Sequence, residues 1–175
     1  VGHDEGHHGH DDPRAVFEEV GEVVHLIAEF PEAELIIKPH TRSGWKQSLT
    51  KDSSIKKLAN VRVASDGAHS VHLMNWADVI IDLATSVVFE AVRARKPVLA
   101  ADYLIAARSA VAYYMPETEL RCRDDVYERI KHFLANGYDN FYVEEHRQRF
   151  LDEMLDYPDA NVLPRYVALL EQLAS

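Results

Sequence analysis

The chain has 175 residues, of which 47% are hydrophobic, so it can form one domain of ordinary size with its own core. Its net charge of −10 opposes general binding to nucleic acid or anionic lipid, and no run of about 18 apolar residues indicates a transmembrane segment. The single cysteine cannot form an intrachain disulfide and the N-terminus lacks a secretory leader pattern, so we expect a cytoplasmic protein.

Helix and strand patterns alternate along the chain, which is typical of a parallel sheet with helices on both faces. The first half predicts a helix from Pro13 to Phe30, a strand at Leu35–Ile37, a polar loop at Thr41–Ser54, a short helix near Ser54–Ala59, a strand at Val61–Ala64 and a helix at Ser70–Trp76. This alternation predicts an α/β fold.

Residues 78–101 predict one βαβ unit with a polar junction. Val79–Ile81 forms a strand, Thr85 and Ser86 begin a helix, and Lys96-Pro97 ends that helix before the second strand. The remaining predictions are a loop with some helix at Tyr103–Tyr114, an edge strand at Glu119–Cys122, and helices at Asp124–Leu134, Val143–Leu155 and Val162–Leu173. The last helix is amphipathic and can pack on its own sheet or on a partner.

The start of the helix in this βαβ unit is a candidate phosphate site. A helix that begins at Thr85 or Ser86 presents free N–H groups beyond the carboxyl end of a parallel strand, where phosphate-bearing ligands bind in open α/β sheets. An ordinary helix N-cap is the alternative interpretation of both residues.

The acidic chain contains one basic segment. Between residues 38 and 62 the only acidic residue is Asp52, and the basic residues are Lys38, Arg42, Lys46, Lys51, Lys56, Lys57 and Arg62. Such a segment is suited to a phosphorylated small molecule.

Together the motifs carry a family resemblance. Leu35–His40, Ala77–Ser86, Phe89-Glu90 and Lys96–Leu99 resemble, in order and spacing, the C-terminal half of GT-B-fold enzymes, above all CDP-glycerol glycerophosphotransferases and capsule or surface-polysaccharide biosynthesis proteins. A more distant similarity is to non-hydrolysing UDP-N-acetylglucosamine 2-epimerases. The resemblance covers about residues 28–124.

The resemblance implies a Rossmann-like three-layer sandwich, of the GT-B C-terminal-domain type, that spans residues 1–175 as a single nucleotide-binding domain of a longer two-domain protein. This domain would bind a nucleotide-diphosphate sugar or polyol donor, whereas an N-terminal half or partner subunit would bind the acceptor. Any contact with the inner face of the membrane would be made through the full-length protein. Neither a metal nor a further cofactor is implied.

The resemblance also implies roles for residues of the βαβ unit. Thr85 and Ser86 match a pair whose hydroxyls and helix-end amides bind the donor pyrophosphate, where negative charge builds up during transfer. Glu90, about one turn into the helix, matches an acid that accepts hydrogen bonds from ribose hydroxyls. A solvated helix residue is the alternative for Glu90.

His40 follows a strand and is expected at the same sheet edge as Ser86. A histidine there can carry a proton near neutral pH, and the resemblance implies that His40 is catalytic, although it can also simply stabilise its own loop. Lys38 and Arg42 are the predicted phosphate partners, with solvated surface positions as the alternative. Asp82 is expected to orient the turn after its strand by side-chain hydrogen bonds.

The chain departs from the polyol-phosphate transferases in the loop that contains Tyr103 and Arg108. It has no counterpart of their Arg-Gly pair and no second site histidine in this loop. We therefore expect a sugar donor rather than a glycerophosphate donor.

The N-terminal segment has two unusual features. The first helix has no strand before it, although a βαβ series usually starts with one, so we expect a first strand that is missing or reduced to a stub before Val1. The segment His3–Asp12 offers four imidazoles and four carboxylates. These suit Zn²⁺ or Ni²⁺, but their spacing favours a solvated Gly-rich loop, and no metal ligand is assigned.

Two other functions stay open. One is a non-catalytic α/β module for assembly or regulation, which predicts no nucleotide affinity. The other is half of an epimerase related to the UDP-N-acetylglucosamine 2-epimerases, which is disfavoured because such enzymes need a second domain and additional acids. Fold alone does not decide among these functions.

Overall fold

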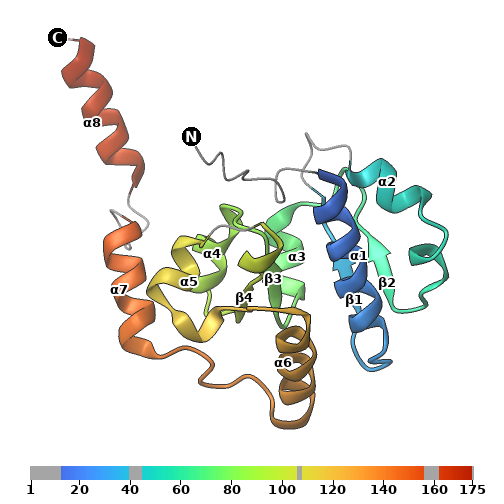
Figure 1. The fold of residues 1–175 in the computed structure, drawn as a ribbon. Helices are drawn as coiled ribbons and strands as arrows, with labels where there is room; N and C mark the ends of the chain where they lie inside the picture. Colours follow the sequence, from blue (N-terminus) through green and yellow to red (C-terminus); the bar gives the residue numbers. More distant parts are fainter. Residues whose placement is uncertain (1–12, 40–44, 106–107, 156–161, 175) are drawn as a thin grey trace, which may run out of the picture.

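The computed structural model describes residues 13–39, 45–105, 108–155 and 162–174, which form an α/β fold (Figure 1). The strands form two parallel pairs: β1 (Leu35–Ile37) with β2 (Val61–Val63), and β3 (Ile80–Asp82) with β4 (Val98–Ala100). Within the described residues the two pairs are separate sheets, so the continuous sheet of a three-layer sandwich stays a prediction.

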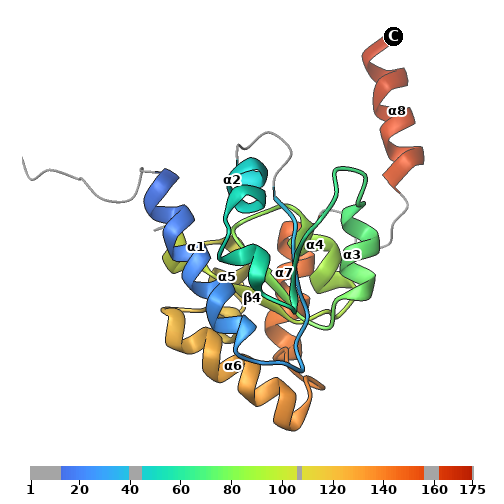
Figure 2. The ribbon, with the colours of Figure 1, turned by 90° about the vertical axis from the view of Figure 1, so that its right-hand side faces the viewer.

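Helices make up most of the remaining described structure. Their bounds are α1 Pro13–Ala28, α2 Trp45–Lys51, α3 Ser70–Trp76, α4 Val87–Arg93, α5 Ala110–Tyr114, α6 Arg123–Asn136, α7 Glu144–Met154 and α8 Val162–Ala174, with short 3-10 turns at Ile55–Lys57, Asp102–Leu104 and Pro116–Thr118. In Figure 2, α1 and α6 lie on one side of the strands and α3 lies on the other. None of the described helices is both long and apolar enough to cross a membrane.

The second strand pair belongs to a densely packed core. All three residues of β4 are buried: Val98 and Ala100 share a cluster with apolar side chains of α4, α5 and α7, whereas Leu99 packs in the cluster around α1. Phe150 of α7 is fully buried and stacks on Phe89 of α4, with 5.5 Å between ring centroids. Burial of this ring fixes α7 against α4, because an aromatic side chain removes a large apolar area from water.

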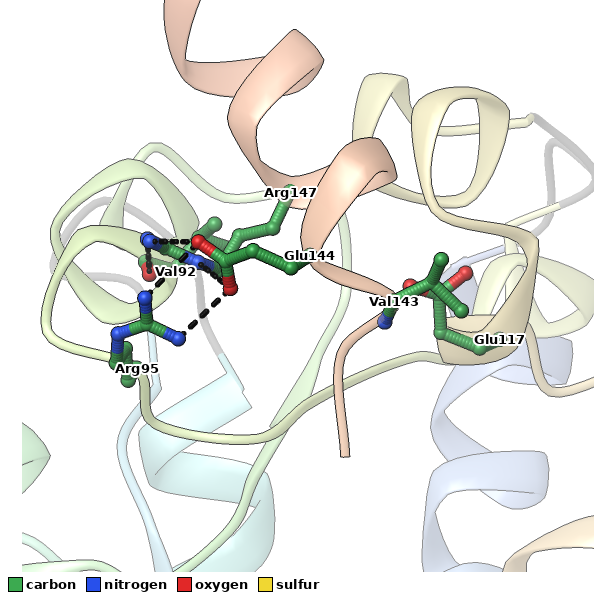
Figure 3. Close-up of polar contacts among 6 residues, drawn as sticks. All are labelled: Val92, Arg95, Glu117, Val143, Glu144 and Arg147. Carbon is green, nitrogen blue, oxygen red and sulfur yellow. Dashed lines mark hydrogen bonds and ion pairs between the residues drawn. The ribbon is translucent and has the colours of Figure 1, made fainter. Parts of the chain in front are cut away.

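A polar network reinforces the contact between α7 and α4 (Figure 3). Arg147 is buried, and its guanidinium donates to the Glu144 carboxylate at 2.8 Å and to the Val92 carbonyl at 3.3 Å. Arg95 donates to the same carboxylate at 2.8 and 2.9 Å. These hydrogen bonds, first from Arg147 and then from Arg95, lower the pKa of Glu144 to about 2. Glu144 therefore remains ionised at neutral pH and pairs with both arginines.

Helix α8 stands away from the rest of the described structure in both ribbon views (Figures 1 and 2). Its Leu163 and Leu173 are 73% and 76% exposed, and Tyr166, Val167, Leu169 and Leu170 are also exposed. The amphipathic pattern predicted this helix, but its apolar side chains do not pack on the described body of the protein.

Two elements predicted between β1 and β2 need correction. The loop predicted at Thr41–Ser54 contains helix α2, because Leu49 is fully buried and attaches this otherwise polar segment to the core around α1. The helix predicted near Ser54–Ala59 is reduced to one 3-10 turn.

The edge strand predicted at Glu119–Cys122 is reduced to a single parallel bridge. Glu119 pairs with Ala100, and the Leu120 N–H donates to the Ala100 carbonyl at 2.9 Å. The strand pairing ends there, since the next N–H, that of Arg121, donates instead to the carboxylate of Asp125 in the first turn of α6 at 2.8 Å.

Candidate functional site

The candidate site is one end of a cavity that separates the two strand pairs. The cavity has a volume of about 820 Å³ and is lined by parts of α1, β1, α3, β3 and α6. At the carboxyl ends of the strands its lining includes Lys38 and Pro39 after β1 and the turn from Asp82 to Ser86 after β3. Volumes of about 300–1,000 Å³ are usual for small-molecule sites.

The turn after β3 is held by the buried carboxylate of Asp82. This carboxylate accepts hydrogen bonds from the Thr85 N–H at 3.0 and 3.2 Å and from the Thr85 hydroxyl at 2.5 Å. Ala84, inside the turn, has a φ of 52°, in the left-handed region. The prediction that Asp82 orients this turn by side-chain hydrogen bonds is confirmed.

Burial has the largest influence on the pKa of Asp82. Removal of the carboxylate from water raises its pKa, whereas the hydrogen bonds from Thr85 oppose this rise. The negative charge of Asp102, at the end of the neighbouring strand, raises the pKa further. The loop therefore carries a carboxylate that the fold makes harder to ionise, next to the residues predicted to bind phosphate.

Thr85 and Ser86 differ in what they can offer a ligand. The hydroxyl and the N–H of Thr85 both donate to Asp82, so neither is available as a phosphate donor while this turn is formed. Ser86 is the N-cap residue of α4, is exposed, and makes no side-chain capping hydrogen bond. The Ser86 hydroxyl is therefore the better placed donor of the predicted pair.

The other predicted site residues are distributed as follows. Lys38 is exposed and is one of the residues that line the cavity, as is Ser86. Glu90 is exposed on α4 and is not one of the residues that line the cavity. His40 and Arg42 lie outside the described residues, as does the segment His3–Asp12. Among the residues that are described, no group of three or more His, Cys, Asp or Glu is placed to bind a metal ion.

The sequence analysis missed Asp102, which follows β4 as Asp82 ends β3. Its carboxylate is buried and accepts hydrogen bonds from the Ser109 N–H at 2.6 Å and the Ser109 hydroxyl at 3.0 Å, both through Oδ2. Its Oδ1 is buried without a hydrogen-bond partner among the described residues. An acidic residue directly after a buried strand was the signal available in the sequence.

The loop after β4 contains the predicted Tyr103 and Arg108. Arg108 is exposed, donates to the Ala112 carbonyl at 3.2 Å, and lies 5.8 Å from the ring centroid of Tyr113. Neither Tyr103 nor Arg108 lines the cavity between the strand pairs. In this structure the loop is fastened to α5 through Asp102 and Ser109.

No protein-family model, curated protein or solved structure matches this chain. The resemblance to GT-B-fold transferases therefore depends on the short motifs alone. The roles predicted for Thr85, Ser86, Glu90, Lys38 and His40 stay predictions.

Proposed function

We propose that the chain is the donor-binding domain of a GT-B-type transferase in surface-polysaccharide biosynthesis. Its ligand would be a nucleotide-diphosphate sugar, with the pyrophosphate at the carboxyl ends of β1 and β3. The observation that carries the proposal is that Lys38, after β1, and Ser86, after β3, line the same cavity although they are far apart in the sequence.

The chemistry of this end suits a diphosphate. The Lys38 ammonium supplies a positive charge and the Ser86 hydroxyl supplies a donor at the start of α4. Because charge accumulates on the leaving diphosphate, donors fixed at this position stabilise the transition state more than the ground state.

In this proposal Thr85 and Ser86 have different roles. Thr85 donates to Asp82 and so fixes the turn, and Ser86 contacts the phosphate. In the same proposal, Glu90 receives the ribose hydroxyls, and His40 and Arg42 act near the reacting phosphate.

Titration with diphosphates tests the proposal. UDP, CDP, GDP and ADP would each be added to the folded chain and followed by NMR and calorimetry. We expect saturable binding of one of them, weakened at least about tenfold in a Lys38→Gln/Ser86→Ala variant, since each lost charged or polar contact removes about 1–3 kcal/mol.

The matched control is Lys57→Gln, which removes a positive charge from the same basic segment away from the cavity. It should leave affinity nearly unchanged. No saturable binding by the folded chain, or equal losses in both variants, would contradict the proposal.

A second candidate function is a non-catalytic assembly module, and the exposed apolar side chains of α8 favour it. It predicts self-association through α8 and no nucleotide affinity. Sedimentation over a range of concentrations would show a dimer that Leu170→Glu abolishes and Glu171→Gln retains. A monomer at all concentrations would count against this candidate.

A further inference from the structure

The main-chain groups of β1 bond to β2 on one edge only. The Leu35 N–H donates to the Asn60 carbonyl at 2.8 Å, and the Ile37 carbonyl accepts from the Ala64 N–H at 2.8 Å. In a strand, alternate residues direct their N–H and C=O groups to opposite edges. The N–H and C=O of Ile36 therefore point away from β2.

Strand β3 has the same arrangement in the other pair. The Ile80 N–H donates to the Pro97 carbonyl at 2.8 Å, and the Asp82 carbonyl accepts from the Ala101 N–H at 2.9 Å. The main-chain groups of Ile81 therefore point away from β4. The far edge of β4, by contrast, is bonded to residues 119–120.

These two open edges face the same cavity. Ile36 and Ile81 both line it, and its lining follows the strands from Glu34 and Val79 to Lys38 and beyond Asp82. Main-chain groups in such a half-buried position usually have hydrogen-bond partners, because an unpaired buried group costs as much as a lost hydrogen bond. The cavity is thus bordered on two sides by strand edges that have no partner strand among the described residues.

The walls of the cavity are apolar on both sides. Ile27 of α1 and Ile130 and Phe133 of α6 line it, as do Leu73 and Met74 of α3. Figure 2 shows that these helices lie on opposite sides of the strands. A strand between them would be covered on both faces, so it must be a continuous run of apolar residues such as Val and Ile.

We propose that an additional strand binds between β1 and β3, parallel to both. It is supplied by apolar polypeptide on the N-terminal side of residues 1–12. Residues 1–12 themselves contain one β-branched residue, Val1. A strand followed by α1 and β1 would form a βαβ unit, the usual connection between parallel neighbours, and such crossovers are nearly always right-handed.

The resulting strand order is β2–β1–new strand–β3–β4, in one sheet. From the new strand the chain goes first to β1 and β2 on one side and then to β3 and β4 on the other side. The direction in which strands are added therefore reverses at the new strand, beside the turn from Asp82 to Ser86. Ligands bind at such reversal points in open α/β sheets. The inference goes beyond the proposed function, because it concerns how the sheet is completed and needs no nucleotide.

The test is an extended chain. A short segment of alternating Val and Ile, flanked by lysines, would be added before Val1, and amide hydrogen exchange would be measured by NMR. We expect the Ile36 and Ile81 amides to exchange about a hundredfold more slowly than in the unextended chain. Ile37 and Ile80, whose main-chain groups already face β2 and β4, are the internal reference.

The control extension carries proline at alternate positions, which removes the N–H groups needed for pairing. It should leave Ile36 and Ile81 unprotected. Unchanged exchange in the Val/Ile extension with the fold intact, or equal protection by the proline control, would overturn the proposal. So would protection of Ile36 and Ile81 in the unextended chain that already equals that of Ile37 and Ile80.

Discussion

The two strand pairs differ in how completely they are enclosed. In the second pair β4 is buried throughout and bonded on both edges, and α4, α5 and α7 cover it; we call these elements the closed half. In the first pair every residue of β1 is only half-buried; β1, β2, α1 and α2 are the open half. The cavity lies against β1 and, in the second pair, against β3. Strands β1 and β4 have equal length but different burial, and we therefore expect them to differ in local stability.

The largest expected effect is on the free energy of unfolding, when a side chain buried in the core of either half is removed. Phe150→Ala removes a fully buried ring from the closed half and should lower the free energy of unfolding by about 3–5 kcal/mol. Leu49→Ala in the open half should cost about 2–3 kcal/mol, the lower part of the usual range, because α2 can move into the vacated space.

Urea unfolding monitored by circular dichroism would measure both losses. Leu163→Ala, at an exposed position of α8, is the control and should change stability by less than about 0.5 kcal/mol. A larger loss for Leu49 than for Phe150 would reverse the proposed ranking of the two halves.

The turn after β3 should give an intermediate effect. Asp82→Ala removes the acceptor for the Thr85 N–H and hydroxyl and should cost about 1–2 kcal/mol, because exposed Thr85 can turn to water. Asp82→Asn keeps one carbonyl acceptor and should cost less. If both variants unfold like the parent chain in urea, the turn does not depend on this side chain.

A smaller effect, of opposite sign, is expected inside the same turn. Ala84→Gly should raise the free energy of unfolding by about 0.5–1 kcal/mol, since a φ of 52° is strained for alanine and free for glycine. Ala94→Gly makes the same substitution at a φ of −77° and should not stabilise. Thermal unfolding would distinguish the two, and equal shifts would argue against strain at Ala84.

The smallest effect concerns pH and the contact between α7 and α4. The pKa of Glu144 is about 2 in the folded protein and 4.5 ordinarily, so the unfolded chain binds more protons between these values. The stability that Glu144 contributes is therefore complete above pH 4.5 and is lost as the pH falls toward 2. Salt should weaken it, because the carboxylate is exposed.

Unfolding at pH 7 and pH 3 would measure this contribution. The Glu144→Gln variant should lose less stability on acidification than the parent chain does. Glu145→Gln, which removes a neighbouring charge outside the network, should behave like the parent. A Glu144→Gln variant with the parent's acid sensitivity would show that the network does not couple to pH.

Local patterns in the sequence were enough to predict most elements. The strand at Leu35–Ile37 and the helix at Ser70–Trp76 are confirmed residue for residue, because β-branched runs and helical spacing are encoded locally. The helix predicted from Pro13 ends at Ala28, two residues before Phe30 and ahead of Pro31. Helix α2 was missed because its formation depends on one long-range contact, through Leu49.

The site was predictable only in part, for a related reason. Lys38 and Ser86 each follow a strand and line one cavity, which agrees with the rule that sites in open α/β sheets lie beyond the carboxyl ends of strands. The commitment of Thr85 to Asp82, the burial of Asp102 and the separation of the strand pairs depend on distances between segments, which no local pattern contains.

The hydrogen-bonded turn from Asp82 to Thr85 also bears on how quickly a ligand could bind. Its conformational entropy is lost when the protein folds, since the carboxylate and the strand end fix its main chain. A ligand that arrives there meets a preorganised surface and does not have to order a loop first. Binding at this turn should therefore be limited by diffusion and orientation rather than by a slow closing motion.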